Sequence, residues 1–208
     1  MPPGDGSMKE KVQNQHKYME LLNINDEKQA VHEIRNLASN LSEHEHLIRS
    51  CIFDLHAAVE FELKRMLFWS FKHLLFITDD KGRNNRIKIN YEKMIDRLNF
   101  MDVWRILKPV IIEWYSSFES IEKINITRNQ AAHGNIDKVN YQGRNPFRDT
   151  DCFCQMYFDV WAIKQEIPKV FERMMLPHYK NRAYYEKYGD ISVSKDIIDK
   201  IHSWYNEN

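Results

Sequence analysis

Apolar residues recur at helical spacing between residues 42 and 77, and this pattern constrains the fold more than any other feature of the chain. One series is Leu47, Cys51, Leu55, Val59, Leu63, Met66 and Leu74. A second series, which widens the same face, is Phe53, Phe61, Phe68, Phe71 and Leu75. Because steps of three and four residues fall on one side of an α-helix, the pattern predicts a long, central helix covered from more than one side. Ser42 followed by Glu45 fits a capping box and predicts that this helix begins there.

The rest of the chain predicts further helices separated by polar loops. Helices are expected over residues 9–22, 26–40, 91–98, 103–126 and 150–176, with a small final helix from about residue 194. Pro109 is expected in the first turn of the main part of helix 103–126, and Pro168 is expected to bend helix 150–176. Residues 78–90 and 135–149 are predicted loops. Only 6 glycines and 6 prolines occur, which argues against an all-β protein rich in turns.

These elements predict an all-α fold, a bundle of two helical hairpins over about residues 42–126 and 127–177. Residues 8–41 form a predicted N-terminal helical extension, and residues 178–208 form a C-terminal one that is a candidate to close a dimer, cover a cleft or bind a partner. Residues 1–7 read as a flexible leader or a remnant of cloning, with Met8 as the natural start.

Charge and cysteine content narrow the class of protein. Thirty basic residues balance thirty acidic ones, so any surface that binds nucleic acid must be a local basic patch. Cys51, Cys152 and Cys154 are too few, and odd in number, for a disulfide framework, which indicates a reducing, cytoplasmic setting. No apolar stretch reaches the roughly 18–20 residues that span a bilayer, so no membrane contact is expected.

The most informative segment is IEKINITRNQAAHGN, which ends the predicted helix 103–126. Arg128 is followed directly by the polar Asn129 and, after four intervening residues, by His133, and Gly134 is expected to stop the helix there. This arrangement resembles the R-x(4–6)-H motif of HEPN domains. The mixture of apolar residues with an embedded glutamate in residues 51–67 is similar to the first long helix of that family. The resemblance implies the fold expected for residues 42–177 and an RNA-cutting site at Arg128, Asn129 and His133.

The chemistry of these residue types suits RNA cleavage without a metal. The reaction needs a base for the 2′-hydroxyl, an acid for the leaving 5′-oxygen and positive charge on the phosphate. Histidine takes either proton role near neutral pH, so His133 is the candidate general acid/base. Arginine offers a permanent cation with donors matched to phosphate oxygens, so Arg128 is the candidate for the scissile phosphate, and Asn129 would orient one of the two.

Helix geometry restricts how these residues meet. Positions five apart on a regular helix differ by roughly 140°, so Arg128 and His133 do not share a face, whereas Asn129 and His133 do. A working site therefore needs a distorted helix end or residues from two chains. The HEPN resemblance implies the second, a homodimer with a composite site. An inhibitory antitoxin is a further candidate partner.

Other basic residues are candidates for binding the RNA backbone. They are Lys81, Arg83, Arg86 and Lys88 in the first predicted loop and Arg144 and Arg148 in the second. Such contacts weaken as salt rises. Solvated loops without a ligand are the plain alternative.

Two polar residues of the long helix, Glu60 and His56, need an interpretation beside the motif. Glu60 is a candidate acid to orient Arg128 or His133, while an i,i+4 pair of Glu60 with Lys64 is the plainer interpretation. His56 lies on a largely apolar stretch, where an interior or interface histidine with satisfied hydrogen bonds is expected.

Metal and cofactor sites are not predicted. The pairs His44/His46 and Cys152/Cys154 have a spacing of two, which points their side chains to different sides of a helix. The chain has no Gly-rich phosphate loop, nucleophile elbow or His-Glu-x-x-His motif. The first hypothesis is therefore a metal-independent endoribonuclease of the toxin or defence type. The alternatives are a non-catalytic HEPN-like module that binds nucleic acid, a nucleotide or a protein partner, and a purely structural helical dimer. In the plainest interpretation of the motif, Arg128 is a capping cation near a helix C-terminus and His133 is a simple C-terminal helix residue beside Gly134, both favourable for the helix dipole.

Overall fold

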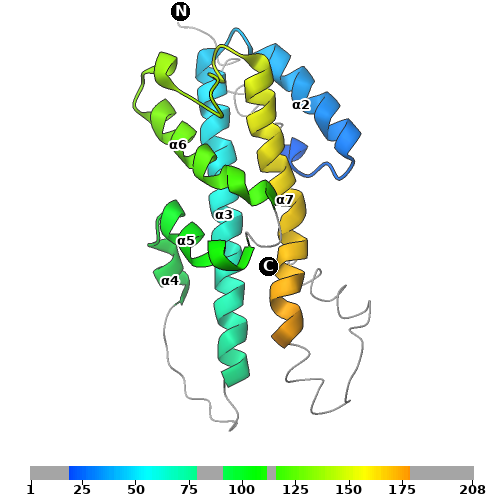
Figure 1. Ribbon diagram of the computed structural model, residues 1–208, viewed down its shortest axis with the longest axis vertical. Coiled ribbons are helices and arrows are strands. Elements are labelled where there is room, and N and C mark those ends of the chain that lie inside the picture. Colours follow the sequence, from blue (N-terminus) through cyan, green and yellow to red (C-terminus); the bar gives the residue numbers. More distant parts are fainter. Residues whose placement is uncertain (1–18, 79–90, 112–115, 179–208) are drawn as a thin grey trace, which may run out of the picture. The chain divides into compact units, whose positions relative to one another are not determined.

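Helices form all of the regular structure in the residues that the computed structural model describes, which are 19–78, 91–111 and 116–178. The α-helices are α2 (Glu27–Leu41), α3 (Glu45–Thr78), α4 (Tyr91–Asp96), α5 (Phe100–Ile111), α6 (Ile121–Ala132) and α7 (Thr150–His178). Two 3₁₀ turns, η1 (Ser116–Ser120) and η2 (Ile136–Lys138), flank α6. No β-strand occurs in these ranges, where Tyr141 and Arg144 form an isolated backbone bridge. The predicted all-α class is confirmed (Figure 1).

The described residues belong to two compact units. The first contains residues 19–60 and 116–165, and the second contains residues 61–78, 91–111 and 166–178. Thus α3 and α7 each contribute their N-terminal part to the first unit and their C-terminal part to the second. The whole Arg128–His133 motif lies in the first unit.

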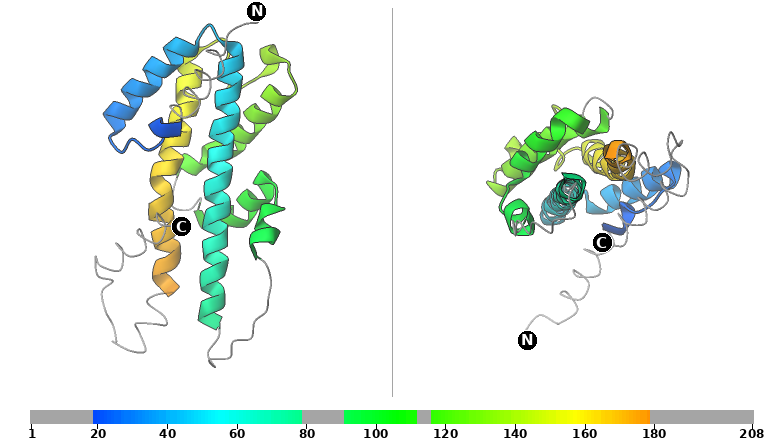
Figure 2. Two further views of the ribbon diagram at one scale, coloured as in Figure 1. Left: turned by 180° about the vertical axis from the view of Figure 1, so that it is seen from behind. Right: turned by 90° about the horizontal axis from the view of Figure 1, so that it is seen from below.

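In the first unit, α2 lies beside the N-terminal part of α7, and α6 crosses the N-terminal part of α3 (Figures 1 and 2). Asp26 is the N-cap of α2, and its carboxylate accepts a hydrogen bond from the Gln29 amide at 2.7 Å. Such a cap satisfies one of the amides that a helix start leaves without a partner. Farther along the chain, the Trp161 indole donates to the Ile24 carbonyl at 2.7 Å, and the Gln165 amide donates to the Leu22 carbonyl at 3.0 Å. These bonds attach α7 to the segment that precedes α2.

The second unit has its own apolar interior. Its buried residues come from four helices: Leu63, Met66 and Leu67 of α3, Ile95 of α4, Phe100, Val103, Trp104, Leu107 and Ile111 of α5, and Ile167, Val170 and Phe171 of α7. The Lys64 ammonium donates to the Asp96 carbonyl at 3.3 Å, where α4 ends. Nowhere in the described part of the chain is a helix long and apolar enough to cross a membrane.

The expected start of the long helix was wrong by three residues. Ser42 does not cap α3; it is the C-cap of α2, has helical φ/ψ and donates its hydroxyl hydrogen to the Ser39 carbonyl at 2.8 Å. The helix α3 begins at Glu45, after a turn in which the His44 amide bonds to the Leu41 carbonyl at 2.8 Å. The serine side chain prefers the carbonyl of the preceding turn over a forward cap, which is a known competition for this residue type.

The single helix expected over residues 103–126 was also wrong. Its place is taken by α5, by η1 and by the first half of α6, and Pro109 lies in the last turn of α5 rather than in a first turn. The serine-rich sequence explains part of the break, because the Ser120 hydroxyl bonds to the Ser117 carbonyl at 2.8 Å. The second arm of the expected first hairpin is therefore not one helix.

Several remaining expectations were met, and others lie outside the described residues. Helices 26–40, 91–98 and 150–176 correspond to α2, α4 and α7, and the loop 135–149 contains only the short turn η2. Most of the expected helix 9–22, the loop 79–90 and everything after residue 178 lie outside the described ranges. The bend at Pro168 stays a prediction.

Candidate functional site

The helix α6 presents the motif at its C-terminal end. Ile121, Ile124, Thr127 and Ala131 form its buried stripe, and Ile126, Asn129 and His133 are exposed. His133 is the C-cap, and its amide bonds to the Asn129 carbonyl at 3.3 Å. Gly134 follows with φ +83°, a left-handed conformation that ends helices and suits glycine. The predicted stop is therefore confirmed, and the His133 side chain is exposed directly beside it.

Arg128 is held in place without a neutralising carboxylate. Its guanidinium carbon lies 5.1 Å from the centre of the Phe53 ring on α3, and Nη1 donates to the Asn129 side-chain oxygen at 3.1 Å. Its Nε is buried and has no hydrogen-bond partner. Within the described ranges, Arg128 forms no ion pair with Asp or Glu. An aromatic face stabilises a cation without cancelling its charge, so this charge remains available to an anion.

The plain interpretation of Arg128 as a cation near the helix C-terminus stays an alternative. Within the described part of the chain, the side chain contacts Phe53 and Asn129. His133 caps the helix through its backbone, so its imidazole is not committed to that role.

The middle of the motif is structural. The Gln130 side-chain oxygen accepts from the Asn140 amide at 2.7 Å, and the Thr127 hydroxyl donates to the Asn140 carbonyl at 2.8 Å. Ala131 is buried. These contacts attach the loop after α6 to the helix that carries Arg128 and His133. Sequence reasoning missed the roles of Gln130 and Thr127, because nothing in the linear sequence connects them with Asn140.

Replacement of Thr127 by valine is expected to lower the free energy of unfolding by about 0.5–1.5 kcal/mol, the usual net value of one hydrogen bond. Valine keeps the volume and the branched shape of this fully buried side chain, so the change removes mainly the bond to the Asn140 carbonyl. Urea unfolding of both proteins measures the difference. Equal stability would mean that the bond contributes nothing.

A buried histidine of α3 contacts α6 one turn before Arg128. His56 on α3 is only 6% exposed, and its Nε2 lies 3.1 Å from the Asn125 side-chain oxygen on α6. Its Nδ1 lies 3.9 Å from the Glu60 carboxylate. The expectation of an interior histidine with a hydrogen-bond partner is confirmed. The role of Glu60 as an acid that orients Arg128 or His133 stays a prediction.

The pKa of His56 is lowered, and burial is the largest cause. The hydrogen bond with Asn125 raises this pKa, the Arg128 guanidinium lowers it and the Glu60 carboxylate raises it. His56 is therefore neutral at pH 7. Its Nε2 must carry the hydrogen, because the side-chain oxygen of Asn125 can only accept.

Acid is expected to destabilise the fold through His56. The unfolded chain binds a proton near the ordinary histidine pKa of about 6.5, whereas folded His56 resists it, so the unfolded state holds more protons below that pH. Stability due to this group is therefore complete above about 6.5 and falls as the pH drops toward the lowered folded pKa. Urea unfolding between pH 7.5 and 5.5 should show a smaller loss for His56→Gln than for the original protein. An equal loss in both proteins would contradict the assignment.

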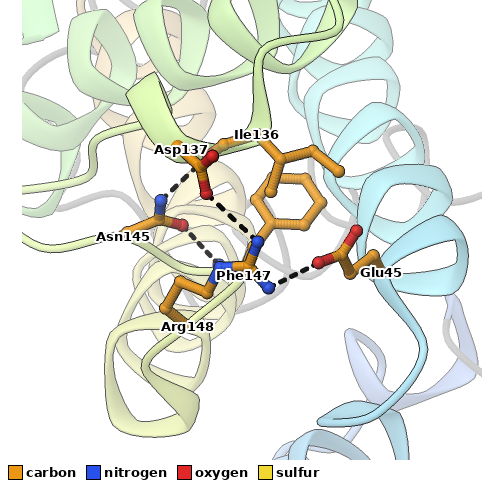
Figure 3. Close-up of polar contacts among 6 residues, drawn as sticks. All are labelled: Glu45, Ile136, Asp137, Asn145, Phe147 and Arg148. Carbon is orange, nitrogen blue, oxygen red and sulfur yellow. Dashed lines mark hydrogen bonds and ion pairs between the residues drawn. The ribbon is translucent and has the colours of Figure 1, made fainter.

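The two loop arginines are paired with carboxylates. Arg148 bridges Glu45 at the start of α3 and Asp137 of η2, the latter at 3.1 Å (Figure 3). Both carboxylates raise the pKa of Arg148, and Arg144 pairs with Asp149 at 3.1 Å. RNA contacts by Arg144 and Arg148 stay a prediction, and each would have to exchange a carboxylate for a phosphate. Lys81, Arg83, Arg86 and Lys88 lie outside the described residues.

The loop around Arg148 is held by its own polar contacts. The Asn145 side-chain amide donates to the Ile136 carbonyl at 2.9 Å, and its oxygen accepts from the Phe147 amide at 2.8 Å (Figure 3). These bonds and the ion pairs of Arg148 fix the segment between α6 and α7 within the first unit.

Cys152 and the pair His44/His46 contact nearby residues of the fold. The buried Cys152 thiol donates to the Tyr141 carbonyl at 3.5 Å, and burial raises its pKa to about 11. At neutral pH this thiol is therefore protonated and is a poor nucleophile. The rings of His44 and His46 meet edge to face with centroids 6.0 Å apart. Among the residues with described positions, no group of three or more His, Cys, Asp or Glu side chains is arranged to hold a metal ion.

Arg128 and Asn129 are thus joined by a hydrogen bond, and His133 is exposed at the same end of α6. Phe53, His56 and Asn125 are further members of this neighbourhood that sequence reasoning did not connect with the motif. Their only sequence signal is the spacing of three residues between Phe53 and His56 and between Asn125 and Arg128. Comparison of the chain with models of protein families, with curated proteins and with solved structures found no match.

Proposed function

We propose that this protein is a metal-independent endoribonuclease of the toxin or defence type, with a site built from Arg128, Asn129 and His133. The observation that carries the proposal is the state of Arg128, whose guanidinium lies on the Phe53 ring and is not paired with a carboxylate within the described ranges. A held but unneutralised cation is what a phosphate-binding group requires.

Each residue has a role that its surroundings support. Arg128 donates to the non-bridging oxygens of the scissile phosphate and stabilises the charge that builds up as the 2′-oxygen attacks. Asn129 limits the rotation of Arg128 through the 3.1 Å hydrogen bond between them. His133 is exposed to solvent and moves the protons, first as base and then as acid.

The proposed assembly is a homodimer with a composite site, and helix geometry is one support for it. Arg128 and His133 are separated by roughly 140° around a regular helix, and α6 remains an α-helix as far as Ala132. One phosphate is therefore reached more easily by Arg128 of one copy and His133 of the other. The HEPN resemblance implies this composite site, together with a bundle of two helical hairpins that carries it. Ile126, which is 53% exposed on the same side of α6 as Asn129, offers an apolar contact for a second copy.

RNA is the proposed substrate, and an inhibitory antitoxin is a further candidate partner. The balanced charge of the chain, thirty basic and thirty acidic residues, favours a local contact with RNA over a wide basic surface. Weak salt dependence, corresponding to few phosphate contacts, is therefore expected for binding.

The substrate requirement gives a direct test. An RNA oligonucleotide and its 2′-O-methyl counterpart are incubated with the protein, and both binding and cleavage are measured. Cleavage of the RNA alone, with similar binding of both, supports attack by the 2′-hydroxyl. Tight binding of both oligonucleotides without cleavage, over several sequences, would favour the non-catalytic binding module instead.

A further inference from the structure

In the first unit, α3 and α6 are connected by two neighbouring side-chain contacts. In one, Phe53 of α3 lies under Arg128 of α6; in the other, His56 of α3 meets Asn125 of α6. Phe53 and His56 are three residues apart on α3, and their partners Arg128 and Asn125 are three residues apart on α6, in the opposite chain direction. Residues at this spacing are neighbours on a helix surface, roughly 5–6 Å apart at Cβ. His56 and Arg128 are therefore diagonal neighbours across two adjacent contacts.

We infer that His56 is a positioning residue for Arg128. Neutral His56 keeps the Arg128 guanidinium on the Phe53 ring, and protonated His56 displaces the guanidinium from that ring. In the neutral state, the Nε2 hydrogen of His56 is donated to Asn125 on the turn of α6 that precedes Arg128. In the protonated state, a second buried cation lies beside Arg128. This inference rests on the proposed function for its catalytic consequence only.

The groups around His56 determine the strength of this coupling. From α3, the Glu60 carboxylate faces Nδ1 at 3.9 Å, and from α6 the Arg128 guanidinium acts with the opposite sign. Asn125 is uncharged, and burial disfavours the imidazolium, so the pKa of His56 lies below its usual value. Because the interaction is mutual, a proton on His56 must weaken the hold on Arg128 as strongly as Arg128 opposes the proton.

The consequence for RNA cleavage is a second histidine in the pH dependence. His133 must be neutral to act as base, and His56 must be neutral to keep Arg128 in place. At acid pH, kcat/KM is therefore expected to fall by up to about a hundredfold per pH unit in the original protein, because two protons must be lost, and by about tenfold per pH unit when His56 is replaced.

The experiment uses the full chain and two independent measurements. The first follows the His56 imidazole and the Arg128 Nε–H by NMR between pH 8 and 5. We expect one transition, with the same midpoint, in both signals. The Arg128→Gln variant should raise the pKa of His56, and Glu60→Gln should lower it. An unchanged His56 pKa in Arg128→Gln would overturn the inference. So would an Arg128 Nε–H signal that does not change as His56 titrates.

The second measurement is the pH profile of kcat/KM for the original protein and for His56→Gln. Glutamine keeps a donor for Asn125 and does not titrate, so the acid limb should become about tenfold per pH unit. The matched control is His32→Gln, because exposed His32 on α2 also contacts an asparagine, Asn36, at 3.1 Å. An unchanged acid limb in His56→Gln would overturn the positioning role. Absence of all cleavage beside intact NMR coupling would instead remove the proposed nuclease function and leave the coupling of His56 with Arg128 established.

Discussion

The His133→Ala variant is expected to cleave RNA about 10²–10⁴-fold more slowly than the original protein, the range that one general acid or base contributes. The imidazole is exposed, and the C-cap contact of this residue uses its backbone amide, so the melting temperature should stay nearly constant. Single-turnover cleavage of a labelled RNA measures the rate, and thermal unfolding of the same samples measures stability.

The matched control for this variant is His46→Ala. His46 is also exposed, and it lies near the start of α3, away from the motif in sequence. Full activity is expected for this protein. A similar loss in both variants would mean that the effect is general and not due to His133.

Arg128→Ala is expected to reduce kcat by about 10²–10³-fold, the usual effect of removing one donor that stabilises developing charge. Arg128→Lys should recover only part of this loss, because an ammonium lacks the planar set of donors that fits two phosphate oxygens. The change should appear in kcat more than in KM, since the contact strengthens as the phosphate gains charge. A normal kcat in Arg128→Ala would remove this residue from the proposed site.

Mixing the two inactive variants tests whether the site is composite. In a dimer of one His133→Ala copy and one Arg128→Ala copy, one site has both Arg128 and His133, and the other has neither. With random exchange, half the dimers are mixed and each has one of two sites, so about a quarter of the original activity should return. A mixture as inactive as its components would show that each site uses residues of one copy only.

The sequence predicted the class of fold because that class depends on local spacing. The first apolar series in α3 and the glycine after His133 are signals within one or two helical turns. Cys51, Leu55, Val59, Leu63 and Met66 of that series are buried, and the helix ends before Gly134. The second series was wrong at Phe61, which is 64% exposed. The failures were also local. At Ser42, one hydroxyl had two competing backbone partners, and the turn of the preceding helix won. The break before α6 depends on similar competition at Ser120.

The candidate site was predictable only as far as it is continuous in sequence. Arg128, Asn129 and His133 were identified because they occur in one short motif. Phe53 is 75 residues from Arg128, and His56 is 69 residues from Asn125. No periodicity within one helix specifies which residue of another helix it will meet. The pairing of Arg148 with Glu45 was missed for the same reason, since the two are 103 residues apart.

The physical state of Arg128 explains why the fold tolerates an unpaired cation. Arg128 is half-buried, so part of its charge loses contact with water, and the ring of Phe53 and the oxygen of Asn129 offset part of this cost. What remains is a guanidinium whose unpartnered Nε is already partly desolvated. An anion that binds there loses less to competition with water than at an exposed arginine.

The most direct test of the account is incubation of the protein with labelled RNA in excess EDTA, beside His133→Ala and His46→Ala, with the product ends identified by mass. We expect the original protein and His46→Ala to cut the RNA and leave 2′,3′-cyclic phosphate ends, and His133→Ala to leave it intact. Equal cutting by His133→Ala would contradict the account, as would products that carry only linear phosphates.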